Sequence, residues 1–160
     1  SKVKLSDRID YNWEFRYYYG HLVAAHINGK VIAFGMKGKD GGMVRVTNQE
    51  TNNRTLIKNL KEDIKDVSFA YSREDIVLGC VDSEGNILIY QIDDTPHSIS
   101  YTLLLHIYHH GNKPKTNFRL IWCPYLPSFD DDDASDDPAE MFVVLSGNRA
   151  EVFNVSLVTS

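Results

Sequence analysis

The densest group of charged side chains lies in an acidic stretch between residues 128 and 140. Asp130–Asp133 are consecutive, and Asp136, Asp137 and Glu140 follow, so the stretch carries seven carboxylates. Consecutive Asp residues lack the alternating ligand spacing and the turn glycine of a calcium loop, so a calcium site is not favoured. The plain interpretation is a solvated surface insertion. The functional alternative is electrostatic attraction of a basic partner segment.

Three histidines near residue 108 invite a metal hypothesis, but their spacing argues against it. On a strand, His106 and His110 share a face while His109 points away. A zinc site needs three or four convergent nitrogen or sulfur ligands. Neither Cys80 nor Cys123 is near in sequence, and no Cys-x-x-Cys occurs. We therefore predict no metal, and we interpret the histidines as polar residues of an outer strand and its exit loop.

Sequence motifs of enzymes are missing from the chain. It contains no Gly-x-Ser-x-Gly, no glycine-rich phosphate loop followed by Lys-Ser/Thr, and no His-Glu-x-x-His. The glycine-rich stretch at residues 37–42 joins two predicted strands and opens no helix, so we interpret it as a hairpin loop. The sequence thus predicts no catalytic residue and no cofactor.

The composition is that of an ordinary soluble globular protein. Apolar residues make up 42% and charged residues 24% of the 160 residues, which excludes disorder for most of the chain. No apolar run approaches the roughly 18 residues that cross a bilayer, and the charged residues 1–10 predict neither a signal nor a transit peptide. The net charge of −5 includes the seven loop carboxylates, so the remaining chain is slightly basic. Cys80 and Cys123 lie in apolar runs, which predicts buried thiols and a reducing compartment.

The elements that must position these residues are short strands. Nearly every apolar cluster is rich in Val, Ile, Phe or Tyr and is bounded by Gly, Asn, Asp or Pro, which predicts β-strands. Three strand pairs recur, within residues 31–47, 76–90 and 141–153. Their spacing is about 44 residues once an insertion of about 19 around the acidic stretch is removed. A period of roughly 40 to 45 with four strands per unit is typical of a WD40 propeller.

We therefore predict an all-β fold, a WD40-like β-propeller portion of about two and a half to three four-stranded antiparallel blades. The blades are expected at residues 21–58, 64–108 and 118–156, with residues 128–140 as an acidic insertion. Residues 1–20 are expected to supply the outer strand that closes the last blade, through Trp13, Phe15 and Tyr17. A propeller needs at least about four blades to close. The remainder of the same propeller is therefore expected on another chain or in further sequence.

The middle unit matches a WD40 blade in every element except its signature dipeptides. Lys61-Glu62 stands where a Gly-His pair is usual, and Tyr90 stands where the third strand usually carries Trp. The hydrogen-bond network that normally holds such a blade is therefore not expected, even though Asp82 is in place. We expect packing to hold the blade instead.

Several stretches spread over nearly the whole chain resemble, in order and spacing, the N-terminal propeller of the Hedls family, the enhancer of mRNA-decapping protein 4. They are Trp13-Glu14, Tyr17-Tyr18-Tyr19-Gly20, Met43-Val44-Arg45-Val46, Arg54-Thr55-Leu56, Phe118-Arg119-Leu120-Ile121-Trp122-Cys123-Pro124 and Arg149-Ala150-Glu151-Val152. The most specific is Ile121-Trp122-Cys123-Pro124, followed by the tyrosine triplet.

The resemblance implies a seven-bladed propeller in a large cytoplasmic scaffold of processing bodies. It implies a non-catalytic role, in which the decapping activator that carries an EVH-type domain meets the decapping enzyme on mRNA. Two alternatives stay open. One is an adaptor of another complex, such as a vesicle coat or a ubiquitin ligase. The other is an enzyme on a propeller platform, which would require convergent His, Asp and Lys side chains around the central channel.

The predicted interaction surface combines aromatic anchors, an acidic rim and basic loop residues. Tyr125 and Phe129 flank the start of the acidic loop, where aromatic side chains beside charged ones suit peptide docking. The candidate residues are Tyr125, Phe129, Asp130, Asp131, Asp132, Asp133, Lys113 and Lys115. The predicted propeller is a disc with two faces, of which one is slightly basic and the other strongly acidic. RNA binding normally needs a dense basic patch, and the basic face carries too little positive charge for that. Direct RNA binding is therefore not expected.

Overall fold

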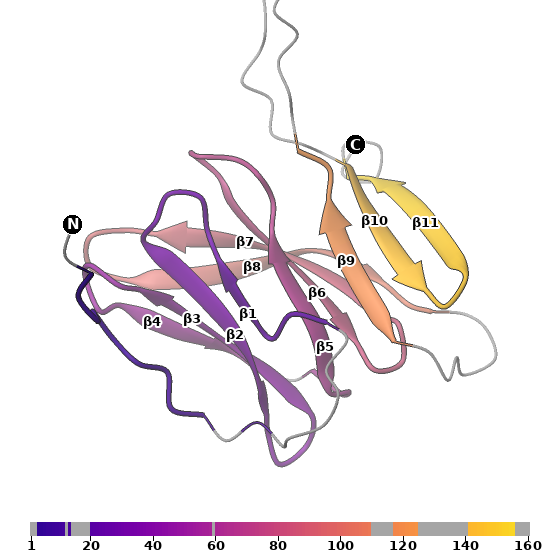
Figure 1. The fold of residues 1–160 in the computed structure, drawn as a ribbon, viewed down its shortest axis with the longest axis horizontal. Helices are drawn as coiled ribbons and strands as arrows, with labels where there is room; N and C mark the ends of the chain where they lie inside the picture. The colour runs from indigo at the N-terminus through magenta and orange to yellow at the C-terminus, as the bar shows by residue number, and fades with distance from the viewer. Residues whose placement is uncertain are drawn as a thin grey trace, which may run out of the picture.

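The fold consists of β-strands arranged in three antiparallel sheets (Figure 1). The computed structural model describes residues 3–11, 13, 20–58, 60–109, 117–124 and 141–155, and these contain eleven strands and no helix. In each sheet, strands that follow one another in sequence pair antiparallel. The predicted all-β class is therefore confirmed. No helix in this described part of the chain is long and apolar enough to cross a membrane.

The first sheet, blade one, buries one face of its strands against its neighbour. It comprises β1 (Val23–Ala25), β2 (Val31–Lys37), β3 (Gly42–Asn48) and β4 (Arg54–Ile57), paired in that order. Burial alternates strictly along β2 and β3, as the period of two in a pleated strand requires. The buried side chains, among them Val31, Ala33, Val44 and Val46, pack against blade two.

The second sheet, blade two, lies between the other two. It comprises β5 (Ile64–Phe69), β6 (Ile76–Asp82), β7 (Ile87–Asp94) and β8 (Ile99–Ile107). Most residues of the two central strands are buried, because blades cover both of their faces. Their near-continuous apolar sequence is what a strand covered on both faces needs.

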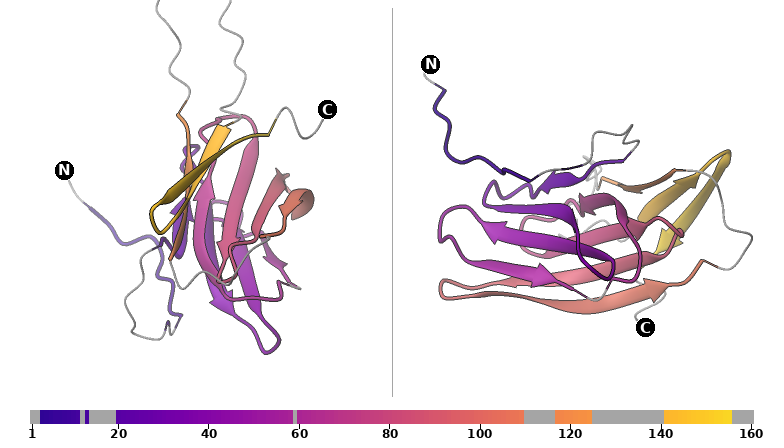
Figure 2. Two further views of the ribbon diagram at one scale, coloured as in Figure 1. Left: turned by 90° about the vertical axis from the view of Figure 1, so that its right-hand side faces the viewer. Right: turned by 90° about the horizontal axis from the view of Figure 1, so that it is seen from below.

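The third sheet, blade three, contains three strands over the described residues. These are β9 (Phe118–Trp122), β10 (Met141–Ser146) and β11 (Arg149–Asn154), in the order β11-β10-β9. Figures 1 and 2 show it beside blade two, with β9 next to the inner strand β5. The boundaries that the repeat predicts for the blades, and the closure of a seven-bladed ring, stay predictions.

Two apolar layers fill the spaces between the blades. One joins blades one and two, and the other joins blades two and three around Trp122 and Phe142. The second layer is tight because Gly79 has no side chain: a Cβ there would lie 3.0 Å from the Leu120 methyl carbons. Gly85 combines a positive φ of 85° with a close approach, since a Cβ would lie 2.7 Å from Phe118. Glycine is the residue that tolerates both.

Blade two combines buried side chains with hydrogen bonds around Asp82, so packing is not its only support. Tyr90 is buried and packs edge-on against Tyr101, with ring centroids 5.8 Å apart. Asp82 organises the turn from β6 to β7: Oδ1 accepts hydrogen bonds from the backbone N–H groups of Glu84 and Asn86, and Oδ2 accepts one from the Asn86 side chain. Asn86 Oδ1 in turn accepts the backbone N–H of His109 at 3.0 Å, which fixes the exit from the outer strand.

The N-terminal segment lies against the face of blade one that points away from blade two. The Tyr11 hydroxyl accepts the backbone N–H of Lys37 at 2.8 Å, and Trp13 Nε1 donates to the Gly35 carbonyl at 2.9 Å. The Trp13 ring packs edge-on against Phe34. This is the face that a last blade would cover. Phe15 and Tyr17 lie outside the described residues, so the closing strand stays a prediction.

The two cysteines differ in environment. Cys80 is fully buried between the blades, and burial, helped by the Asp66 carboxylate, raises the pKa of its thiol. It therefore stays protonated and unreactive at neutral pH. Cys123, which directly follows β9, is only half-buried, so the expectation that both thiols are buried is wrong for this one. Its position just before Pro124, where the sheet ends, explains the exposure.

Shortening a side chain in the layer between the blades should cost much of the stability. Leu78 is 0% exposed, whereas Leu103 on the outer strand is 48% exposed. We expect Leu78→Ala to lower the free energy of unfolding by about 2–5 kcal/mol, since it leaves a cavity. Leu103→Ala, the matched control, should cost less than about 1 kcal/mol. Urea unfolding of both variants tests this, and equal losses would contradict the assigned packing.

Candidate functional site

One buried carboxylate joins all three blades at one rim. Asp66 on the inner strand β5 is 1% exposed. Its Oδ1 accepts the backbone N–H of His21, which precedes blade one's inner strand, at 2.6 Å. Its Oδ2 accepts the backbone N–H of Leu120 on β9 at 2.7 Å. Each oxygen therefore bonds a different neighbouring blade.

Two basic side chains stand beside this carboxylate. The His21 ring lies with Nδ1 3.6 Å from Asp66 Oδ1, and Arg119 Nη2 lies 3.4 Å from that same ring nitrogen. Burial raises the pKa of the Asp66 carboxyl, and it outweighs the opposing effects of the two backbone hydrogen bonds and of His21 and Arg119. Arg119 Nε is buried without a hydrogen-bond partner.

Sequence reasoning missed this cluster of Asp, His and Arg at the inner strands. The available signal was an Asp in an otherwise buried strand, but no sequence motif links Asp66 to residues 21 and 119. The cluster resembles what an enzyme on a propeller platform would need. Its chemistry points elsewhere, because both carboxylate oxygens already accept backbone N–H groups and the side chain is enclosed. We interpret Asp66 as a structural tie between blades.

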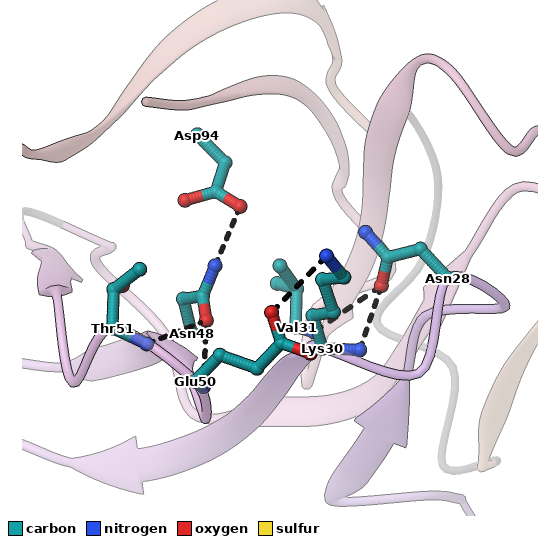
Figure 3. A network of polar contacts seen from close by, with 7 residues as sticks. All are labelled: Asn28, Lys30, Val31, Asn48, Glu50, Thr51 and Asp94. Carbon is teal, nitrogen blue, oxygen red and sulfur yellow. Dashed lines mark hydrogen bonds and ion pairs between the residues drawn. The ribbon is translucent and has the colours of Figure 1, made fainter. Parts of the chain in front are cut away.

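A second polar tie lies at the opposite rim (Figure 3). Asn48 at the end of β3 donates from Nδ2 to Asp94 Oδ2 at the end of β7, at 2.7 Å, which links blade one to blade two. Asn48 Oδ1 accepts the backbone N–H groups of Glu50 and Thr51 and so holds the β3–β4 turn. The other Asp94 oxygen, Oδ1, is buried without a hydrogen-bond partner.

A hollow of about 510 Å³ opens beside this tie, between the first turns of blades one and two. Four carboxylates contribute to its lining against two cations: Glu74, Asp75, Asp93 and Asp94 against Lys30 and Arg73. The Lys30 ammonium already pairs with Glu50 at 3.1 Å. The rim around the hollow is therefore negative on balance, and it suits a positively charged side chain better than an anion.

The outer strand of blade two carries the densest exposed apolar residues of the described chain. Tyr101, Leu103, Leu104 and Tyr108 are 37%, 48%, 40% and 57% exposed. They fall within eight consecutive residues on or just after β8. Large apolar side chains gathered in this way mark interaction surfaces more often than scattered ones do.

The candidate residues taken from the sequence lie outside the described residues. This applies to Tyr125, Phe129, Asp130, Asp131, Asp132, Asp133, Lys113 and Lys115, so their role stays a prediction. Of the three histidines, His106 stacks near Tyr108 with ring centroids 3.9 Å apart, and His109 packs edge-on against Phe118. His110 is not described. Within the described ranges, no group of three or more His, Cys, Asp or Glu side chains could hold a metal ion.

Comparison with known proteins identifies one family. A family model described as the WD40 region of Ge1, enhancer of mRNA-decapping protein, matches residues 1–160. Enhancer of mRNA-decapping protein 4 of Danio rerio is 33% identical over 162 residues, and that of Homo sapiens is 31% identical over 163 residues. The Drosophila melanogaster homolog is 31% identical over 178 residues. Each match covers 100% of this chain but only 11–12% of the relative.

Solved structures support the fold alone. Sqt1 of Chaetomium thermophilum, bound to the N-terminus of the ribosomal protein L10, superposes with a TM-score of 0.54 at 17% identity. A second Sqt1 structure gives 0.52 at 16% identity. Each match covers 76% of this chain and 29% of the Sqt1 chain.

Removing one of the two hydrogen bonds that Asp66 accepts should weaken the contact between blades. Asp66→Asn keeps one acceptor oxygen but turns an amide N–H toward a backbone donor. We expect the free energy of unfolding to fall by about 1–3 kcal/mol. Asp63→Asn is the control, since Asp63 is half-exposed and its oxygen lies 3.7 Å from Lys37 Nζ. That pair should contribute less than about 1 kcal/mol.

The contribution of Asp66 to the free energy of unfolding should change with pH in a defined direction. Because the folded pKa of Asp66 is raised, its stabilising contribution is full below the unfolded pKa of about 4 and is lost as pH rises through the folded value. The destabilisation caused by Asp66→Asn should therefore be larger near pH 4 than near pH 7. Urea unfolding over this range measures it, and a difference that grows with pH would contradict the assignment.

Proposed function

This chain belongs to the family of the WD40 region of Ge1, enhancer of mRNA-decapping protein, and from that premise we propose that its blades form a non-catalytic binding platform for decapping factors. The observation that carries the proposal is the family match over residues 1–160. In this role the blades bring the decapping activator and the decapping enzyme together, and so promote decapping and decay of mRNA.

The geometry supports a binding role. Polar ties at two rims and two apolar layers fix the blades relative to one another. A fixed array of blades presents its turns and outer strands in constant positions, which lowers the entropy cost of binding.

The partners and the place of action extend the proposal beyond the family itself. The chain spans about 11% of the length of the curated relatives it matches, so the partners of a whole family protein are assigned here by inference. We propose the decapping activator that carries an EVH-type domain and the decapping enzyme as partners, and cytoplasmic processing bodies as the location. The surface proposed from the sequence, Tyr125 and Phe129 beside Asp130–Asp133, supplies aromatic anchors next to an acidic rim.

Two other functions define what the test must exclude. The first is an adaptor of a vesicle coat or a ubiquitin ligase, which would use the same propeller for other partners. The second is an enzyme on a propeller platform, for which the cluster at Asp66 is the nearest counterpart among the described residues. The family match favours the decapping role over both.

Recovery of partners from cytosol tests the proposal directly. We expect the tagged full-length protein to co-precipitate the decapping activator and the decapping enzyme, as identified by mass spectrometry. A tagged propeller of unrelated function serves as the control. Recovery of coat subunits or of a ubiquitin-ligase core in place of decapping factors would overturn the proposal.

Direct RNA binding is expected to be weak. Phosphate-driven binding requires a dense basic patch and weakens steeply with salt, whereas the chain as a whole carries a net charge of −5. In a filter-binding titration with a single-stranded RNA, we expect no affinity tighter than about 10 μM even at low salt. Tighter, salt-sensitive binding would show that RNA is a partner of this region.

A further inference from the structure

We propose that the outer edge of β8 is a docking site, where an extended apolar peptide segment of a partner protein adds as a fifth strand to blade two and places a basic residue at its acidic end. This deepens the proposed function, because it names a surface and a kind of ligand for the binding platform. The inference rests on the shape and chemistry of β8 and of the turn that precedes it.

The backbone edge of β8 is available over a long distance. Among the described residues, β8 pairs only with β7 and forms the last strand of its sheet. Figure 2 (right) shows it along the outer border of the molecule. Its nine residues span about 30 Å. Exposed N–H and C=O groups along such an edge are the template for strand addition.

The side chains of β8 lack most features that normally protect an edge. Natural edge strands are kept short or carry Lys, Pro or inward charges. β8 contains no Lys, Arg, Asp, Glu or Pro. The outer strand of blade one, β4, shows the usual protection, since it has four residues and begins with Arg54. The difference between two outer strands of one chain points to a use for the longer one.

The register of β8 supplies contacts on both faces of an added strand. Tyr101 lies opposite Ile92 and Leu103 opposite Tyr90, on the face toward blade one, whereas Leu105 lies opposite Ile89 on the other face. The register shifts between Ile89 and Tyr90, which leaves Leu104 as a bulge. The regular stretch before the bulge, up to Leu103, is therefore where we place the added strand.

The end of β7, which pairs with the start of β8, is acidic, and the turn between the two strands is held in place. Asp93 pairs with Ser100 across the strands and is exposed. Asp94 contributes to the lining of the negative hollow, and its Oδ1 is buried without a hydrogen-bond partner. The turn between β7 and β8 is fixed by the Thr95 backbone N–H bonded to the Ser98 carbonyl at 2.9 Å. A Lys or Arg at the matching end of a docked segment would therefore meet preplaced carboxylates.

This charge distribution also decides between possible occupants. A second copy of the chain that pairs edge to edge through residues 99–109 would bring no Lys or Arg of that segment to the acidic end, because the segment contains none. A separate partner segment with one basic end satisfies both the apolar edge and the carboxylates. We therefore assign the edge to a partner peptide.

Selection from random peptides tests the proposal without assuming a partner. A phage-displayed library of peptides of about nine residues, the length of β8, is selected on the full-length protein. We expect enriched peptides to carry β-branched or aromatic residues in alternation, with Lys or Arg at one end and no Pro in the strand portion. Bound peptide should protect backbone amides of β8, but not of β4, from hydrogen exchange.

Variants of exposed residues separate docking from folding. Leu103→Lys places a charge on the edge and should weaken binding of a selected peptide at least about tenfold. Asp93→Asn should weaken it less and reduce its salt dependence. Val23→Lys, at a residue 44% exposed on another strand, is the matched control and should leave binding unchanged. Thermal unfolding confirms that each variant is folded.

Three results would overturn the proposal. One is a library that yields no enriched peptide, and another is enriched peptides that bind Leu103→Lys as tightly as the unchanged protein. The third is self-association through β8, seen as dimers in sedimentation that Leu103→Lys abolishes. None of these bears on recovery of decapping factors from cytosol, so failure here and failure of the proposed function are distinguishable.

Discussion

The structure depends on how the blades are joined, and Asp66 is the most constrained part of that junction. A carboxylate removed from water is costly unless its oxygens are bonded. Here the two oxygens bond backbone N–H groups on opposite sides, one before blade one and one in blade three. The Asp66 carboxylate thereby positions both neighbouring blades, because its two buried oxygens are satisfied by these backbone N–H groups. The apolar layers supply most of the burial, while this carboxylate fixes the register in which the layers meet.

Much of the fold is predictable because strand and turn signals are local. The outer strand of blade two occurs at Ile99–Ile107, within the expected range 64–108, and its apolar residues are flanked by clear breaks. The inner strand of blade two begins at Ile64. A Lys-Asp pair within it interrupts the apolar pattern, and that Asp is the one that joins the blades.

The parts of the candidate site that escaped prediction are all non-local. The tie between Asn48 and Asp94 spans 46 positions in the sequence, and no pattern in either strand marks the pairing. In the sequence, β8 looks like an ordinary apolar strand. Periodicity does not show which strand of a sheet has an unpaired backbone edge. Conversely, the residues that sequence reasoning favoured, such as Tyr125 and Phe129, were chosen from local composition and lie outside the described residues.

The three-way bond at Asp66 also constrains the order in which the chain can assemble. Its partners come from positions 21 and 120, on either side of residue 66, so the junction closes only after two long loops have closed. Contacts of such sequence separation form late and slow the folding of β-rich proteins. During synthesis, blade two emerges before Leu120, so one carboxylate oxygen of Asp66 lacks its backbone partner until β9 is made. The junction that makes the finished array rigid can therefore become native only after β9 has been synthesised.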